Sequence, residues 1–306
     1  MRAVVTGGAG FIGSNLVDAL VARGDEVVVL DDLSTGKRSN VNPAARFVEG
    51  SILTDALDEA IRDAEVCFHL AAQADVPTSV ARPDYDAHVN VVGTVRVLAA
   101  AGDASVVFSS TGGAIYGECE RPAREDDPLR PLSPYGIAKL SGEEYLAGWN
   151  RMHGTSHTAL RFANVYGPRQ EASLEGGVVA IFLNAMAAGA ETRIYGDGQQ
   201  TRDFVHVDDI VRALLAAVGR GGAFNAGSGV ETSVLELHRQ CSAVAGELRE
   251  PIFGPAREGD VLRSVLDVSR IGRELGWQPE VPLDDGLRRT WAWVQAEEGG
   301  GAAGTK

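Results

Sequence analysis

The stretch RAVVTGGAGFIGSNLVDALVARG, residues 2–24, decides the fold. A short β-branched run leads into glycines at Gly7, Gly10 and Gly13, and an apolar pattern with helical spacing follows them. Such glycines permit a sharp turn and a close approach to a pyrophosphate, and the helix N-terminus offers free N–H groups and the positive end of its dipole. The stretch therefore predicts a strand, a phosphate-binding turn and a helix. A tight turn without a ligand is the alternative.

The first half of the chain repeats this alternation of strand and helix patterns. Apolar runs rich in β-branched residues recur at EVVVLDD (26–32), AEVCFHLA (64–71) and SVVFSS (105–110), with longer helical patterns between them. Strands that alternate with helices are typical of a parallel sheet covered on both faces. We therefore expect an α/β fold with a doubly wound parallel sheet, a Rossmann fold.

Beyond about residue 170 the pattern loosens into Gly-rich loops, an Ala-rich helical pattern at 178–189 and isolated strand patterns at 192–196 and 223–227. We interpret this part as a smaller, interleaved substrate lobe. The predicted division is a dinucleotide-binding domain over 1–175 with a returning segment near 203–227, a substrate-binding lobe over 176–296 and a disordered tail over 297–306.

Composition and charge exclude several classes of protein. The 306-residue chain has no apolar run near the length of a membrane span, and its formal net charge of −14 would repel nucleic acid. Its start lacks the basic and apolar regions of a signal peptide, so we expect a cytoplasmic location. Cys67, Cys119 and Cys241 show no paired spacing, so we expect neither a disulfide framework nor a metal site.

A carboxylate ends the second predicted strand. Asp31 lies 18 residues after Gly13, where an acidic side chain can accept hydrogen bonds from both adenosine ribose hydroxyls and would repel a 2′-phosphate. This position favours NAD over NADP. The alternatives are that Asp31 caps the turn-rich segment that follows it, or that Lys37 and Arg38 hold a phosphate.

Tyr135 and Lys139 lie one helical turn apart in SPYGIAKLSGEEY, residues 133–145. Ser133 can cap this helix and Pro134 suits its first turn, so both side chains should project from one face. A free phenol has a pKa of about 10, but a nearby ammonium and a nicotinamide cation would stabilise the phenolate. Tyr135 could then remove a proton from a substrate alcohol. A chance pair is the alternative.

Hydroxyl side chains end the strand that precedes this helix. Ser109, Ser110 and Thr111 should emerge at the carboxyl edge of the sheet, where ligands bind in such folds. One of them could hold the oxygen that Tyr135 deprotonates, and we prefer Thr111, with Ser110 next. A simple strand-end cap is the alternative.

Taken in order, TGGAGFIG, Asp31, FSSTGGAIYG and YGIAK resemble the extended short-chain dehydrogenase/reductase family of NAD-dependent sugar-nucleotide enzymes, from residue 1 to about 295. Further stretches look most similar to the 4-epimerase group of this family: HLAAQADVPTSV, NVVGT, LRFANVYGPRQ, GVVAIF, TRDFVHVDD and REGD.

The resemblance implies that the chain interconverts UDP-glucose and UDP-galactose through a 4-keto intermediate, with NAD recycled in place. Tyr135 would take the hydroxyl proton, Lys139 would hold the ribose and Thr111 would assist. Alternatives of the same fold are a UDP-glucuronate 4-epimerase and a sugar-nucleotide dehydratase or decarboxylase. A non-catalytic NAD sensor is a different class, and it would have no need for the tyrosine–lysine pair.

The resemblance also assigns the ligand contacts by position. Those expected for NAD are Gly7, Gly10, Phe11, Ile12, Gly13, Asp31, Asp32, Leu33, Ser34, Thr35, Gly36, Ser51, Ile52, Leu70, Ala71, Ala72, Gln73, Asn90, Ser109, Tyr135, Lys139 and Phe162. Those expected for the UDP-sugar are Thr111, Tyr135, Asn164, Val178, Arg193, Ile194, Tyr195, Arg202, Arg257, Asp260 and Ser264.

The chain departs from its relatives at a few positions. Gly112 and Gly113 stand where dehydratases carry an acidic pair and decarboxylases a glutamate, which favours epimerisation. Ser51 replaces an aspartate that contacts adenine in many relatives, so this contact should be a weaker hydroxyl bond. Ser264 replaces a bulky aromatic residue found in some epimerases and should leave room for an N-acetyl group.

The family also implies a homodimer, in which helices around residues 84–102 and 134–152 of each protomer would form a four-helix bundle. An apolar stripe through Val89, Val92, Val95 and Ala99 offers some support. The alternative is that this stripe faces the sheet.

Overall fold

A seven-stranded parallel sheet with the order β10-β6-β5-β4-β1-β2-β3 forms the centre of the computed structural model, which describes residues 1–172, 177–246, 249–256 and 261–301. All its strand pairs are parallel. The predicted α/β fold with a doubly wound parallel sheet is thus confirmed. The strands are β1 (Arg2–Thr6), β2 (Glu26–Asp31), β3 (Arg46–Glu49), β4 (Val66–His69), β5 (Ser105–Thr111), β6 (Thr158–Phe162) and β10 (Gly222–Ala226).

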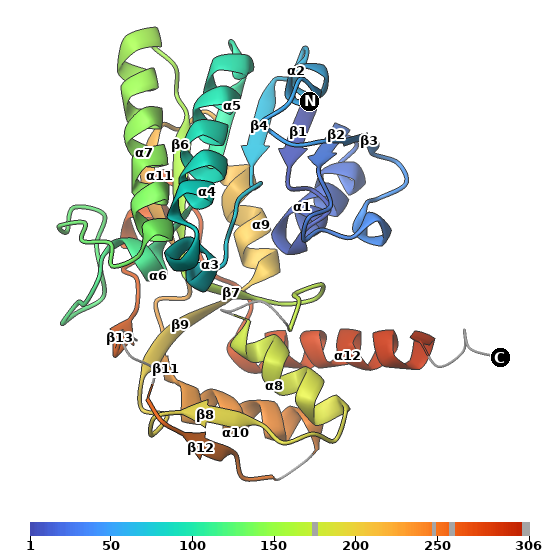
Figure 1. Ribbon diagram of the computed structural model, residues 1–306, viewed down its shortest axis with the longest axis vertical. Helices are drawn as coiled ribbons and strands as arrows, with labels where there is room; N and C mark the ends of the chain where they lie inside the picture. Colours follow the sequence, from blue (N-terminus) through green and yellow to red (C-terminus); the bar gives the residue numbers. More distant parts are fainter. Residues whose placement is uncertain (173–176, 247–248, 257–260, 302–306) are drawn as a thin grey trace.

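Helices cover both faces of the sheet (Figure 1). On one face lie α1 (Phe11–Ala22), α9 (Val207–Ala216) and α11 (Ser269–Leu275), and on the other lie α2 (Ala56–Ile61), α5 (Gly93–Ala101) and α7 (Pro134–His153). Alternate strand residues serve the two layers, because successive side chains point to opposite faces of a sheet. Val5 and Phe68 pack in the first core, and Val4 and Cys67 in the second.

The strand order reverses beside β1, which has β2 on one side and β4 on the other. The connections leave β1 and β4 toward opposite faces, so a crevice opens outside the carboxyl ends of these strands. Ligands of doubly wound folds bind at this position. The connection from β4 to α5 contains three short elements: α3 (Val76–Ala81), α4 (Pro83–Ala87) and the π-helical turn η2 (His88–Val92).

A second lobe lies beneath the carboxyl edge of the sheet (Figure 1). Its helices α8 (Val178–Ala187), α10 (Val234–Ala245) and α12 (Leu283–Gly301) share a separate apolar core. Two small sheets complete the lobe: β7 (Asn164–Tyr166), β9 (Thr201–His206), β11 (Glu231–Ser233) and β13 (Arg263–Ser264) form one, and β8 (Arg193–Tyr195) pairs with β12 (Ile252–Gly254) in the other. Among the described helices, none is long and apolar enough to cross a membrane.

The chain passes between the two parts more than once, because β10 returns to the main sheet after β9 has joined the second one. The predicted domain boundary at residues 175 and 176 lies outside the described residues. The predicted start of a disordered tail at residue 297 is wrong, since α12 continues to Gly301. Helix-favouring residues from Gln295 to Glu298 carry the helix past residue 297. Residues 302–306 of the predicted tail lie outside the described residues.

Candidate active site

The glycine-rich turn between β1 and α1 leaves no room for a side chain at Gly7 or Gly13. Gly7 has a φ of +73°, and a Cβ there would lie 2.7 Å from the backbone nitrogen of Ala71. A Cβ on Gly13 would lie 2.1 Å from the carbonyl oxygen of Gly7. Gly10 is the N-cap residue of α1 and has no side chain that could cap the first N–H groups of the helix. The turn therefore offers backbone donors and the helix dipole to an anion that comes close.

Asp31 lies beside this turn at the end of β2. Its Oδ2 accepts a hydrogen bond from the Ala9 N–H at 2.9 Å, and its Oδ1 accepts one from the Leu33 N–H at 2.8 Å. Burial raises the pKa of Asp31, and these backbone donors oppose the rise. Each oxygen keeps a second lone pair, so the carboxylate can still accept ribose hydroxyls.

The two cations near Asp31 have other partners. Lys37 forms an ion pair with Glu171, and the guanidinium of Arg38 stacks 3.9 Å from the ring centroid of Phe47. The alternative that they hold a 2′-phosphate is therefore not supported by their contacts. The turn and Asp31 together fit NAD, with the pyrophosphate at the start of α1 and the adenosine ribose at Asp31.

The loop that follows β4 is held by a buried polar cluster. Asn90 accepts a hydrogen bond from the Gln73 N–H at 3.0 Å and donates one to the Gln73 carbonyl at 2.8 Å. Asp86 Oδ1 accepts from Asn90 Nδ2 at 2.9 Å and from Gln73 Nε2 at 2.8 Å. Both amide hydrogens of Asn90 are thus engaged, so its predicted support of NAD would act through the shape of this loop.

Tyr135 and Lys139 lie on α7 as the spacing predicts. Ser133 caps the helix by accepting a hydrogen bond from the Gly136 N–H at 3.2 Å. Lys139 is 3% exposed, and its Nζ donates to the Ser109 carbonyl at 2.9 Å. The same Nζ lies 5.8 Å from the ring centroid of Tyr135. One ammonium is therefore held beside the phenol and behind the carboxyl end of β5.

Burial decides the electrostatics of this pair. It raises the pKa of Tyr135 above its usual value, and the Asp86 carboxylate adds to the rise. It lowers the pKa of Lys139 to about 8, and Asp86 opposes this change. The chain alone therefore keeps Tyr135 protonated at neutral pH. Of the two cations expected to make the phenol acidic, the chain supplies only Lys139, and that one does not overcome desolvation.

The strand-end hydroxyls do not all reach the same space. Ser109 Oγ donates to the His69 carbonyl at 3.1 Å. Ser110 is buried and its hydroxyl donates to Glu143 on α7, so the prediction that Ser110 is catalytic is wrong. Side chains alternate along a strand, and Ser110 therefore points to the opposite face from Thr111. Thr111 is partly exposed at the end of β5 and remains the candidate.

Two substrate-lobe residues approach the segment after Thr111. A Cβ on Gly113 would lie 3.9 Å from Asn164 Oδ1 and 4.0 Å from Ser264 Oγ. The structure thus brings the segment that follows β5 close to β7 and β13. Gly112 has no such room, because a Cβ there would lie 2.5 Å from the side chain of Leu266.

Of the residues assigned to the nucleotide, some are exposed and could contact a ligand, whereas others are buried. Ile194 is buried in the core of the second lobe, so its side chain cannot line a base pocket; its neighbours Arg193 and Tyr195 are exposed on the other face of β8. Arg202 on β9 donates to the carbonyls of Thr201 and Val261 at 2.8 and 2.7 Å. Val178 begins α8 and packs against the same core. The predicted contacts at Arg257 and Asp260 lie outside the described residues.

The other predicted NAD contacts gather at strand ends. Phe11 and Ile12 begin α1, Asp32 to Gly36 follow β2, and Leu70 to Ala72 follow β4. The side chains of Ile52 and Phe162 are buried among apolar residues, so these two could contact NAD only through the backbone. Ser51 Oγ accepts from the Leu53 N–H at 3.3 Å and can still donate.

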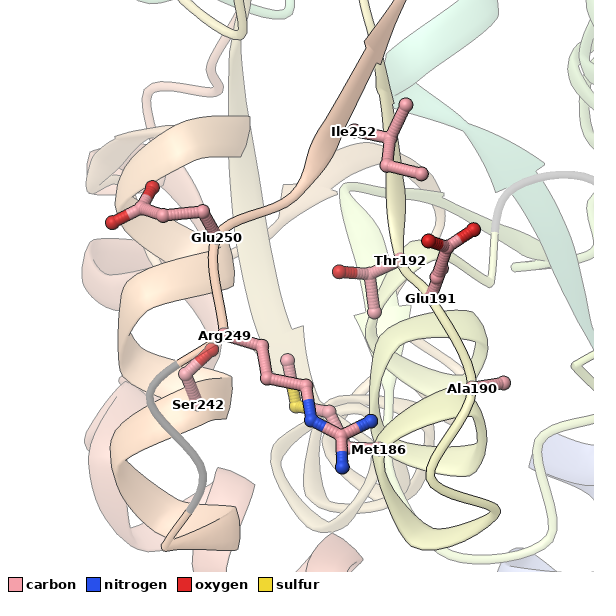
Figure 2. Close-up of a pocket in the computed structure, with 8 residues that line it drawn as sticks. All are labelled: Met186, Ala190, Glu191, Thr192, Ser242, Arg249, Glu250 and Ile252. Atoms are coloured by element: carbon pink, nitrogen blue, oxygen red, sulfur yellow. The ribbon is translucent and has the colours of Figure 1, made fainter.

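A cavity of about 290 Å³ lies in the second lobe, between α8, α10 and the segment before β12 (Figure 2). Met186, Thr192, Ser242 and Arg249 are among its lining residues, and Arg249 donates to the Gly189 carbonyl at 2.7 Å. None of the described residues assigned to NAD or to the sugar nucleotide lines it. The carboxyl edge of the main sheet is therefore the candidate active site.

Sequence reasoning missed two buried groups behind this edge. Asp86 lies on α4, which packs against α7, and its charge acts on Tyr135 and Lys139. Arg161 on β6 pairs with Glu143 on α7. A signal for the first was present, because Asp86, Asn90 and Thr94 recur at four-residue spacing and form a polar stripe on a buried helical face.

Comparison with known proteins gives a consistent family. Residues 3–227 match the model of the NAD dependent epimerase/dehydratase family. The chain is 44% identical over 299 residues to a putative UDP-glucose 4-epimerase of Methanocaldococcus jannaschii, with 95% of this chain and 98% of the relative covered. It is 47% identical over 304 residues to a UDP-glucose 4-epimerase of Mycolicibacterium smegmatis, with 95% and 97% covered.

Solved structures agree with these relatives. A UDP-glucose 4-epimerase of Thermotoga maritima with UDP-glucose superposes with a TM-score of 0.94 at 45% identity, covering 97% of this chain and 100% of the other. A Thermus thermophilus UDP-glucose 4-epimerase in complex with NAD gives a TM-score of 0.91 at 40% identity, with 96% and 99% covered.

Proposed function

Because the chain belongs to the NAD-dependent epimerase/dehydratase family, we propose that it is an NAD-dependent UDP-sugar 4-epimerase that interconverts UDP-glucose and UDP-galactose. The observation that carries this proposal is the placement of Tyr135 and Lys139 on one face of α7, behind the strand end that carries Thr111. The relatives with the highest similarity given above share this activity by name, and they cover nearly the whole chain.

The chain's residues divide the work of the reaction. Bound NAD supplies an acceptor and donor of hydride. The turn at Gly7, Gly10 and Gly13 would hold its pyrophosphate, and Asp31 would hold the adenosine ribose. Tyr135, as the phenolate that Lys139 and the nicotinamide cation would together stabilise, takes the proton from the sugar 4-hydroxyl and returns it, and Lys139 donates to the nicotinamide ribose. The Thr111 hydroxyl orients the same sugar oxygen.

The space beside Gly113 favours epimerisation over the related reactions of this fold. Elimination of water needs an acid and a base in addition to the tyrosine, and Gly112 and Gly113 supply neither. Asn164 and Ser264 border the space, so both are proposed to contact the substrate. Because Ser264 is small, N-acetylated sugars should also fit. Arg202, Arg193 and Tyr195 are proposed contacts of the nucleotide.

A product assay tests this proposal. The purified protein is incubated with UDP-glucose, UDP-glucuronate, UDP-N-acetylglucosamine and dTDP-glucose, and the products are resolved by chromatography. We expect UDP-galactose from UDP-glucose. A 4-keto-6-deoxy sugar or a pentose would identify a dehydratase or a decarboxylase instead, and turnover of UDP-glucuronate alone would identify a uronate epimerase. No turnover of any of them would favour the NAD-sensor alternative.

We also propose that the protein is a cytoplasmic homodimer that serves galactose metabolism. Large apolar side chains are exposed on α7, where Ile137 is 54% and Met152 is 67% exposed, and a groove of about 500 Å³ runs along them. Val92, on the adjoining η2, is 43% exposed, and Ala99 on α5 is exposed too, so these two stripe residues do not face the sheet. Sedimentation of the wild type and of Ile137→Asp tests this proposal: we expect a dimer for the wild type and a monomer for the variant.

A further inference from the structure

Asp86 is a buried carboxylate that the proposed reaction does not use. It lies on α4, which packs against α7, and it is 1% exposed. Its Oδ1 accepts hydrogen bonds from Gln73 and Asn90, whereas its Oδ2 is buried without a hydrogen-bond partner among the described residues. A half-satisfied buried carboxylate costs free energy unless a positive charge lies nearby. The question is therefore which cation compensates Asp86.

The charged groups around Asp86 leave one buried candidate, because Arg82, one helical turn before it, is exposed and its guanidinium lies 4.4 Å from the Tyr85 ring centroid. From β4, His69 is neutral, because burial lowers its pKa to about 3. From β6, Arg161 is paired with Glu143, which lies on α7 itself. Lys139 remains, because it is buried on α7, which packs against α4, and the charges of Asp86 and Lys139 act on each other.

The remaining elements around α7 bring no competing buried charge. The bounds of α3, α6 (Gly112–Ile115) and β5 contain no titratable side chain. On α4 and η2, Asp84 and His88 are exposed. On α5, Arg96 reaches away to the carbonyl of Thr54. As far as the structure is described, Asp86 and Lys139 are thus the two buried, opposite charges behind the candidate active site that have no other charged partner.

We propose that Asp86 is a positioning residue that keeps Lys139 in its ammonium form inside the protein, a role that rests on the function proposed above. Lys139 must carry its charge to bind a ribose hydroxyl as a full donor and to stand as a cation beside Tyr135. Burial of an ammonium opposes that charge, and a carboxylate in the same low-dielectric surroundings restores it. The Gln73 and Asn90 amides hold Asp86 in place for this purpose.

The inference predicts a pH-dependent defect. Asp86→Asn keeps the size and one accepting oxygen of the side chain and removes the charge. If the pKa of Lys139 falls from about 8 by about one unit, the charged fraction drops about five-fold at pH 8 and only about 1.3-fold at pH 6.5. A loss of shape or packing would act equally at both pH values.

The test is the affinity of the nucleotide-free, full-length protein for NAD, measured by calorimetry at pH 6.5 and pH 8 with intact folding checked by circular dichroism. Asp84→Asn is the matched control, because it removes the same charge from an exposed position of α4. We expect Asp86→Asn to lose about five-fold in affinity at pH 8 and less than about two-fold at pH 6.5. We expect Asp84→Asn to behave as the wild type at both.

An equal loss at both pH values, or no loss, would overturn the inference. If Asp86→Asn does not fold, the variant Lys139→Arg is tested instead. Because a guanidinium stays charged at pH 8, the NAD affinity of this variant should be the same at pH 6.5 and pH 8. The NAD affinity of the wild type should fall about two-fold between these pH values. A fall equal to that of the wild type would contradict the proposed role. Because NAD affinity needs no turnover, failure of the epimerase proposal in the product assay would be seen separately.

Discussion

Arg161→Met removes the buried cation that joins β6 to Glu143 on α7. Arg161 and Glu143 have side chains only 5% and 7% exposed, with a closest N–O distance of 2.7 Å. Glu143 also accepts from the Ser110 hydroxyl, and Arg161 donates to the Tyr116 hydroxyl at 2.7 Å. The substitution leaves a buried carboxylate without its cation, which typically costs about 3–5 kcal/mol of unfolding free energy. Because Ser110 directly precedes Thr111, activity should fall as well.

Urea unfolding at pH 7 measures this cost. Arg288→Met is the matched control, since its ion pairs with Asp284 and Asp285 are exposed and should contribute at most about 1 kcal/mol. The double variant Glu143→Leu/Arg161→Met should recover most of the loss, because replacing both buried charges by apolar side chains is often neutral. A cost below about 1 kcal/mol for the single variant, or a double variant that is no more stable than the single one, would refute the reasoning.

Three further predictions concern the glycines and pH. Gly13→Ala should abolish NAD binding in calorimetry because its Cβ would lie 2.1 Å from a carbonyl oxygen, whereas Gly148→Ala, 3.9 Å from its nearest atom, should bind normally; equal affinities would contradict this. Gly112→Ala should cost about 1–3 kcal/mol in urea unfolding through its 2.5 Å contact with a leucine, and Gly113→Ala less than about 0.5 kcal/mol; equal costs would be evidence against the packing described. The pKa of Lys139 is lowered from 10.5 to about 8, so the unfolded chain binds more protons between these values and stability rises with pH there. The unfolding free energy of the wild type minus that of Lys139→Met should therefore increase from pH 8 to pH 10, and a flat difference would speak against the lowered pKa.

The parts of the fold that depend on local pattern could be predicted from the sequence. The glycine turn, Asp31 at the end of β2 and the spacing of Tyr135 and Lys139 are each fixed within one strand–turn–helix unit or one helix. Their meeting at one edge then follows from the parallel order of the sheet, because the carboxyl ends of its strands share a side.

Features that depend on tertiary packing could not be predicted in the same way. The sequence ranks Ser110 next after Thr111, and only the packing of α7, which supplies Glu143 on one face of β5, excludes it. The side chain of Ile194 lies in the core and not in a base pocket, because it is on the face of β8 that α8 and α10 cover. Asp86 gained its importance from α4 packing on α7, across about fifty residues of chain. In each case the sequence gives the type of residue, but the direction in which its side chain points depends on how the elements pack.

The proposed chemistry depends most directly on the phenol of Tyr135. The decisive measurement is the initial rate of UDP-glucose formation from UDP-galactose by the wild type, by Tyr135→Phe and by the control Tyr85→Phe, which removes a hydroxyl from a partly exposed tyrosine of α4. We predict a loss of at least about 100-fold for Tyr135→Phe and an unchanged rate for Tyr85→Phe. A folded Tyr135→Phe protein that turns over at the wild-type rate would contradict the assignment of Tyr135 as the residue that moves the proton.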